Sequence, residues 1–330
     1  MPRTVHDGFF KEVFGDPVLA ADELRAILPA ELAARIDWPS LAPMPASFVD
    51  EVLAQRVGDL VFCARVTEGE EVLLWFLIEH QRKEEWWMIL RVLDMHGKMW
   101  RHWRRLHPEA RTVPAILPVV VYHGTRPWQA PRSMGELYGS TGNTLFAPHL
   151  LACGFVLDDL CAASDDELRA RHMDAFARLS LFAMARAAAD DFLDRLTGDW
   201  RAELRDMAMA RNVERLVVFL RYTLHVNRHV DLETLRARLL PLVGEDVEEA
   251  IVTVADKLRQ EGFDQGLERG LERGLERERR RLLLRLLGQR FGALPESLLG
   301  RVGAGSADDL QRWFDRTLGA STLDEIFAES

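Results

Sequence analysis

The chain has 330 residues, of which 48% are hydrophobic, and a formal net charge of −10. This composition excludes a mainly disordered chain, and the acidic balance excludes a uniformly basic coat for nucleic acid, though not a local basic cleft. No stretch approaches the roughly 18 apolar residues of a membrane helix and the start lacks a signal-peptide core, so we expect a soluble cytoplasmic protein that contacts no membrane.

The first half of the chain predicts strands mixed with helices. Residues 1–45 have helical spacing and end in a proline-spaced loop from Pro39 to Pro45. Two apolar β-type runs follow, 57–66 and 72–79, and the glycine-containing segment between them is typical of a hairpin. A helical stretch over 84–106 and a buried strand over 113–124 complete an α/β sheet flanked by helices.

The second half predicts helices throughout. Apolar periodicity is helical from about Asp165 to Lys257, and the last 45 residues read as short helices joined by glycine and proline turns. We therefore divide the chain into an α/β domain, a helical region, a glycine-repeat helix or linker and a small helical domain, over residues 1–160, 161–257, 258–285 and 286–330.

Between the helical parts, glycines recur every four residues, and GLER occurs three times between Gly266 and Arg277. Each glycine costs about 1 kcal/mol against alanine in a helix, so close approach of a second helix would justify them. A homo-oligomer formed through this segment is one interpretation, and a flexible repeat-expanded linker is the slightly favoured alternative.

The hairpin carries two carboxylates at its open end. If its turn centres on Gly69, Asp59 lies directly opposite Glu79, and like charges so placed need compensation. Gln81 points to the same side, and oxygen ligands of this kind suit Mg²⁺ rather than zinc. Spacing alone leaves a second interpretation equally open, in which both carboxylates are strand-end residues that reach water.

Four short motifs occur in order over about 120 residues. They are His6-Asp7-Gly8-Phe9-Phe10-Lys11, Arg56-Val57-Gly58-Asp59-Leu60, Glu79-His80-Gln81, and a segment from Pro118 through Tyr122-His123-Gly124 to Trp128. Together they resemble the recombination-promoting nuclease and YhgA-like transposase family. The hairpin with its carboxylates resembles the core of the wider PD-(D/E)xK nuclease superfamily.

The resemblance implies a magnesium-dependent DNA endonuclease, a phosphodiester hydrolase associated with recombination and mobile DNA, on a PD-(D/E)xK nuclease-like mixed sheet. It makes Asp59 and Glu79 metal ligands and places Gln81 where the superfamily usually has lysine. Lys83 or Lys11 is then the candidate to supply the missing positive charge. Two alternatives remain: a catalytically inactive DNA-binding or assembly protein with this fold, and a transposase that also joins strands.

Three residues of these motifs, His6, Asp7 and His123, lie outside the hairpin. We expect Asp7 to cap the first helix, with the alternative that His6 and Asp7 both reach the site. We expect His123 to be a hydrogen-bonded turn residue rather than an acid or base.

The segment from Arg82 to Arg111 has a local charge of +4, from eight basic and four acidic residues. Its helix would place four basic residues close to one face and its tryptophans mostly on another. The basic residues, which could bind a DNA backbone, are Arg91, Lys98, Arg101 and Arg105. A solvated charged face over a tryptophan-rich core explains the same pattern, and the position beside the carboxylates makes the two interpretations equal.

Overall fold

A computed structural model describes residues 5–44, 60–67, 71–79, 85–138, 146–209 and 213–328, with only the backbone at 71–79, 209, 245–247, 258–259, 261–274, 307 and 318. The chain forms two compact units, Met1–Ala255 and Asp256–Ser330. In the described part of the chain, no helix combines the length and apolar composition needed to cross a membrane.

The first unit contains a mixed five-stranded sheet in the order β1-β2-β3-β4-β5. The first three strands are antiparallel neighbours, whereas β3, β4 and β5 run parallel to one another. The expected mixture of strands and flanking helices is confirmed. The strands are β1 (Ile36–Pro43), β2 (Leu60–Val66), β3 (Glu71–Glu79), β4 (Ala115–Tyr122) and β5 (Val156–Asp159).

Strand β1 corrects the predicted loop between Pro39 and Pro45. Proline removes a donor from a sheet ladder, but an edge strand tolerates it. Among the described strands, β1 lies at the edge of the sheet and pairs with β2 alone. The pairing shifts between Asp37 and Ala42, and within this irregular stretch the Ser40 hydroxyl accepts a hydrogen bond from the Arg65 amide at 2.8 Å. A side chain thus replaces one main-chain acceptor.

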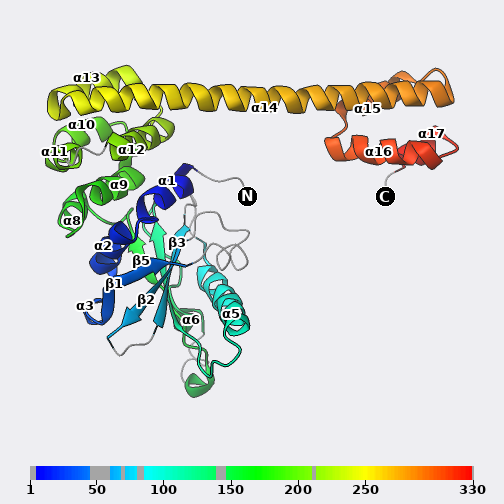
Figure 1. The fold of residues 1–330 in the computed structure, drawn as a ribbon. Coiled ribbons are helices and arrows are strands. Elements are labelled where there is room, and N and C mark those ends of the chain that lie inside the picture. Colours follow the sequence, from blue (N-terminus) through cyan, green and yellow to red (C-terminus); the bar gives the residue numbers. More distant parts are fainter. Residues whose placement is uncertain are drawn as a thin grey trace. The chain divides into compact units, whose positions relative to one another are not determined.

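Helices cover both faces of the sheet (Figure 1). Helix α5 (Met88–Leu106) connects β3 to β4 and buries Met88, Ile89, Val92, Met95 and Met99, which pack in one cluster with Val61 and Val120 of the sheet. On the other side lie α1 (Val5–Phe14) and α2 (Pro17–Ile27), followed by the short α3 (Ala30–Ala33). Helix α1 buries Phe9, Phe10, Val13 and Phe14.

The helical region packs with the sheet in a single unit, although the sequence separates the two at residue 160. Its helices follow the short α6 (Met134–Leu137) and η1 (Ala147–His149). They are α8 (Asp165–Arg169), α9 (Ala175–Arg186), α10 (Phe192–Thr197), α11 (Arg201–Met209), α12 (Val213–Val226) and α13 (Leu232–Val243).

A buried ionic cluster ties this region to the sheet. Arg171, which lies between α8 and α9, donates to both Glu23 oxygens of α2 at 3.1 Å and to Asp158 of β5 at 2.9 and 2.6 Å. Glu23 is fully buried. Burial, followed by the charge of Asp158, raises the pKa of the Glu23 carboxyl well above its ordinary value. Three separate segments of the first unit therefore meet at one arginine.

The second unit begins within a long helix, α14 (Glu245–Phe291), and continues with α15 (Glu296–Ala304), α16 (Ala307–Gly319) and α17 (Leu323–Phe327). Its core contains Leu283, Leu287, Val302, Leu310, Trp313, Ile326 and Phe327. The backbone of the glycine repeat is helical, which favours the helix over a flexible linker. Self-association through it stays a prediction.

Candidate active site

The three parallel strands end side by side. Glu79, the last residue of β3, is in register with Tyr122, the last residue of β4, and Tyr122 is in register with Asp159, the last residue of β5. We call this the carboxyl end of the sheet. In open α/β sheets, ligands bind outside the carboxyl ends of parallel strands, so this is the first place to look for a site.

The hairpin register differs from the predicted one by two residues. Leu60 pairs with Phe76 and Val61 with Trp75, so the predicted register, which set Asp59 directly opposite Glu79, is wrong. The turn does not set the register alone, because β2 also pairs with β1 and β3 with β4. A shift of one residue would move every side chain of a strand to the opposite face of the sheet, whereas a shift of two leaves each side chain on the same face.

Several predicted site residues fall outside the described part of the structure. Asp59, Gln81 and Lys83 lie in segments that it does not describe, and only the backbone of Glu79 is described. The position of Glu79 at the carboxyl end is therefore established by its backbone register. The role of all four residues stays a prediction.

Two motif histidines meet at the carboxyl end. His6 lies in the first turn of α1, and His123 directly follows β4. Their ring centroids are 4.8 Å apart. His123 is buried, with 7% of its surface exposed. The fold thus brings together the first and last of the four motifs beside the strand that ends in Glu79.

Sequence reasoning missed Tyr222 of α12. Its hydroxyl lies 2.7 Å from Nδ1 of His6, and its ring stacks on Phe9 with centroids 3.9 Å apart. Burial raises the pKa of this phenol far above its ordinary value, so the hydroxyl stays protonated. No local signal could have found Tyr222, because it is 216 residues away from His6 in the chain.

The Tyr122-His123-Gly124 segment requires glycine at its last position because a side chain there would clash. A Cβ atom on Gly124 would lie 2.1 Å from the Tyr122 hydroxyl, which no side chain permits. The Trp128 ring packs edge-on against Tyr122 at 5.0 Å, and the Trp128 amide donates to Asp159 at 2.7 Å. Asp159 also accepts from two amides after β5, so this carboxylate stabilises the loops around the site.

Asp7 does not cap the first helix, contrary to expectation. Helix α1 already includes Val5 and His6, which makes Asp7 a residue of the first turn. A carboxylate there is still favourable, because it faces the positive end of the helix dipole. Lys11 follows one turn later, and at roughly 100° per residue both lie on a different flank of α1 from His6.

The four basic residues of α5 differ in how they are paired. Arg91 forms an ion pair with Glu85 at 2.7 Å and Lys98 with Asp94 at 2.9 Å, while Arg105 contacts Nδ1 of His102 at 3.0 Å. None of the described carboxylates forms an ion pair with Arg101, which is exposed. Arg101 is therefore the cation of this stripe best able to contact a phosphate.

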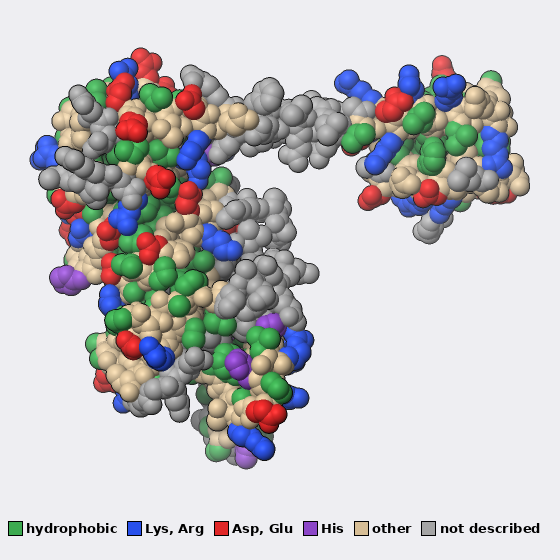
Figure 2. All heavy atoms as spheres, in the orientation of Figure 1, with side chains coloured by type: hydrophobic (Ala, Val, Ile, Leu, Met, Phe, Trp, Pro, Cys, Tyr) green, Lys and Arg blue, Asp and Glu red, His purple; other side chains and the backbone are tan. Residues whose placement is uncertain are grey.

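The tryptophans of this segment do not form the core beneath the stripe, so that part of the second interpretation is wrong. Methionines, Ile89 and Val92 fill that face, whereas Trp86 and Trp87 are 51% and 57% exposed. Figure 2 shows Lys and Arg side chains beside hydrophobic and histidine side chains over α5. Exposed aromatic rings among cations are typical of surfaces that bind nucleic acid bases as well as phosphates.

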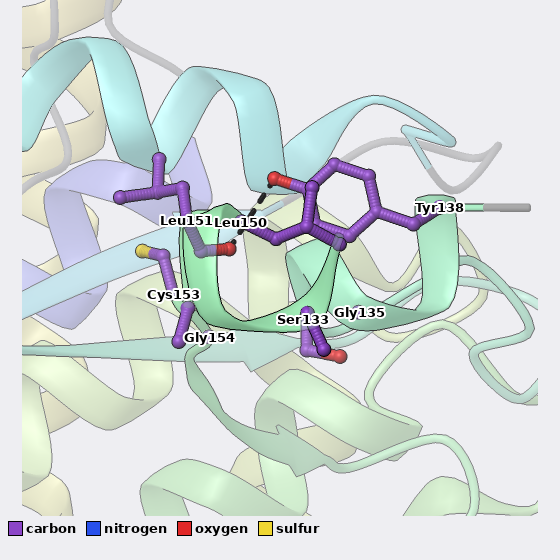
Figure 3. A pocket seen from close by; sticks show the side chains of 9 residues that line it. Ser133, Gly135, Tyr138, Leu150, Leu151, Cys153 and Gly154 are labelled. Carbon is purple, nitrogen blue, oxygen red and sulfur yellow. Dashed lines mark hydrogen bonds between the residues drawn. The ribbon is translucent and has the colours of Figure 1, made fainter. Parts of the chain in front are cut away.

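A pocket of about 520 Å³ lies at the other end of β5, which we call the amino end of the sheet. Ser133 and Gly154 form a bridge there just before β5 begins, and the Tyr138 hydroxyl donates to the Leu151 carbonyl at 3.3 Å across the wall (Figure 3). Its described lining contains no carboxylate and no histidine. The described side chains also contain no group of three or more metal-binding residues.

The profile of the family described as "Putative transposase, YhgA-like" matches residues 4–214. This match covers more than half of the chain, and the chain belongs to that family, as the four motifs led us to expect.

Curated relatives are similar over shorter or longer parts of the chain. Recombination-promoting nuclease RpnD of Escherichia coli is 30% identical over 177 residues, which cover 50% of this chain and 62% of that protein. Recombination-promoting nuclease RpnA of Escherichia coli is 26% identical over 78% of this chain and 85% of that protein. Inactive recombination-promoting nuclease-like protein RpnE of the same species is 26% identical over 78% of this chain and 82% of that protein. No solved structure matches the chain.

Proposed function

We propose that this protein is a magnesium-dependent DNA endonuclease of the PD-(D/E)xK type that acts in recombination or on mobile DNA. One observation carries the proposal: motifs from α1, β3 and β4 meet at the carboxyl end of the sheet, with Glu79 in register with Tyr122 and His6 against His123. The names of the relatives RpnD and RpnA support the same chemistry.

Asp59 and Glu79 are the residues that would hold Mg²⁺, because hard carboxylate oxygens are its preferred protein ligands. The backbone of Glu79 suits this role, since it ends a strand where ligands of parallel sheets bind. When bound, the ion would polarise the phosphate and favour ionisation of a nearby water. Gln81 would orient the attacking water by hydrogen bonding, but its neutral amide adds no positive charge.

Cations from two other segments would complete the site. Lys83 or Lys11 would supply the charge that Gln81 lacks. Arg91, Lys98, Arg101 and Arg105 on α5 would bind the phosphate backbone, and the exposed rings of Trp86 and Trp87 would contact bases. Helix α5 starts nine residues after Glu79 in the chain, so the backbone-binding surface would adjoin the cleavage site.

The test is cleavage of supercoiled plasmid by the purified protein with Mg²⁺ and with a chelator. We expect nicking that requires Mg²⁺ and that Asp59→Ala abolishes. Asp37→Ala is the matched control, because this acidic residue of β1 forms an exposed ion pair with Arg65 at 3.9 Å and should be dispensable. Equal nicking by the Asp59→Ala protein would contradict the proposal.

The second candidate is a catalytically inactive DNA-binding or assembly protein, and the similarity to the inactive relative RpnE favours it. DNA binding without cleavage in the same experiment would support this candidate. Strand-transfer products formed from a donor end would instead point to a transposase that also joins strands.

A further inference from the structure

The helical region reaches the carboxyl end of the sheet through α12. Three contacts between α1 and α12 recur every three residues along α1: His6 with Tyr222, Phe9 with Tyr222, and an ion pair between Glu12 and Arg221. This spacing follows one face of the helix. The first of these contacts involves a motif histidine beside His123, so it concerns the site and not only the packing.

The contact favours one tautomer of the His6 ring, by an argument from the buried hydroxyl of Tyr222. Tyr222 is 2% exposed. A buried hydroxyl that donates no hydrogen bond destabilises the fold by the full free energy of its desolvation. Among the described residues, Nδ1 of His6 is the acceptor offered to this hydroxyl, at 2.7 Å. In a neutral imidazole with an accepting Nδ1, the proton is on Nε2.

A donor at Nε2 has a use at this position. The opposite tautomer would turn a lone pair towards an anionic ligand, whereas an Nε2–H group can donate to a phosphate oxygen in a charge-assisted hydrogen bond. The His6 ring lies beside the strand ends at which the proposed nuclease would bind the scissile phosphate.

We propose that Tyr222 is a positioning residue of this active site, which holds His6 in the Nε2–H tautomer so that His6 donates to a phosphate oxygen of the DNA. The proposal rests on the proposed nuclease function and extends it, because it makes the helical region part of the site. The catalytic contact belongs to His6, and Tyr222 acts only through it.

The substitution that tests this is Tyr222→Phe, which removes the hydroxyl and keeps the ring stacked on Phe9. Long-range proton–nitrogen spectra of the full chain, labelled with nitrogen-15 at its 10 histidines, report the tautomer of each ring. The His6 signals are identified by their loss in His6→Gln. We expect an unprotonated Nδ1 in the wild type and a changed tautomer distribution in Tyr222→Phe.

Nicking kinetics provide the second measurement. Loss of one orienting hydrogen bond should lower kcat about tenfold with little change in KM. In the His6→Gln background, where a side-chain amide replaces the ring, Tyr222→Phe should have no further effect. Tyr138→Phe is a matched control at the amino end, and Glu12→Gln removes the neighbouring ion pair without touching His6. Both should keep wild-type kcat.

Several results would overturn the inference. They are a proton on Nδ1 of His6 in the wild type, an equal loss of kcat from Tyr222→Phe in the His6→Gln background, and the same loss from Glu12→Gln. If the wild-type protein cuts no DNA, the proposed function fails separately. The inference then stands only if Tyr222→Phe both shifts the His6 tautomer and weakens DNA binding, and it falls otherwise.

Discussion

The two ends of the sheet differ in what they bring together. At the carboxyl end, His6 and His123 meet beside the strand whose backbone ends at Glu79, and Tyr222 is added from α12. At the amino end lies a pocket of about 520 Å³ whose described lining has neither a carboxylate nor a histidine. The motif residues that the structure describes therefore gather where the parallel strands end, and the described lining of the pocket includes none of them.

The difference between the two ends of the sheet is tested most directly by removing one carboxylate at each end. Glu79→Gln should lower plasmid nicking by about a thousandfold, because metal-assisted charge stabilisation is worth several kcal/mol. Glu136→Gln is the control at the amino end, where this residue accepts from Ser133 at 2.9 Å, and it should keep nearly full activity. Equal losses in the two variants would remove the distinction between the ends.

The carboxyl end is also anchored by buried charge, which a stability measurement can test. Arg171→Met leaves Glu23 and Asp158 without their shared cation, and should reduce the free energy of unfolding by about 3 to 5 kcal/mol in a urea titration. Arg236→Met breaks an exposed pair with Glu248 and should cost at most about 1 kcal/mol. A small effect at Arg171 would show that the cluster does not stabilise the fold.

The same cluster predicts an unusual dependence of stability on pH. The pKa of Glu23 is raised in the folded state, so between the ordinary carboxyl pKa and the raised value the folded protein binds more protons than the unfolded one. Stability should therefore fall as pH rises through this window. Glu23→Gln keeps the shape and removes the titration, so its melting temperature should fall less over the same window. Identical pH profiles would contradict the assignment.

A smaller effect is expected on the helix that leads away from the carboxyl end. Arg101→Ala should weaken DNA binding several-fold and reduce the salt dependence by about one counterion, as loss of one phosphate contact does. Lys98→Ala should have less effect, because Asp94 already neutralises Lys98 at 2.9 Å. Fluorescence anisotropy at several salt concentrations measures both. Equal effects would mean that the ion pair opens on DNA.

The smallest effect is expected in the pocket itself. Burial raises the pKa of the Cys153 thiol, which disfavours the reactive thiolate, and Cys153→Ala should leave nicking unchanged within about twofold. A large loss of activity in this variant, with an unchanged melting temperature, would move the active site to the amino end.

Much of the architecture could be predicted from the sequence because it is encoded locally. Apolar runs of β type predicted β2, β3 and β4, helical periodicity predicted α5 and the helical region, and four short motifs indicated the family. The strand β1 was missed because Pro39 and Pro43 signal a loop in isolation. Only its place at the edge of the sheet makes them acceptable.

The sequence by itself determined most of the elements, the family and the residues worth testing. The tertiary structure decided which of them meet: the two-residue change of hairpin register, the cluster of Glu23, Arg171 and Asp158, and the contact of His6 with Tyr222. The physical reason is that periodicity is a property of neighbouring residues. A buried hydrogen bond between residues 216 positions apart depends on how two helices pack, and no local pattern records it.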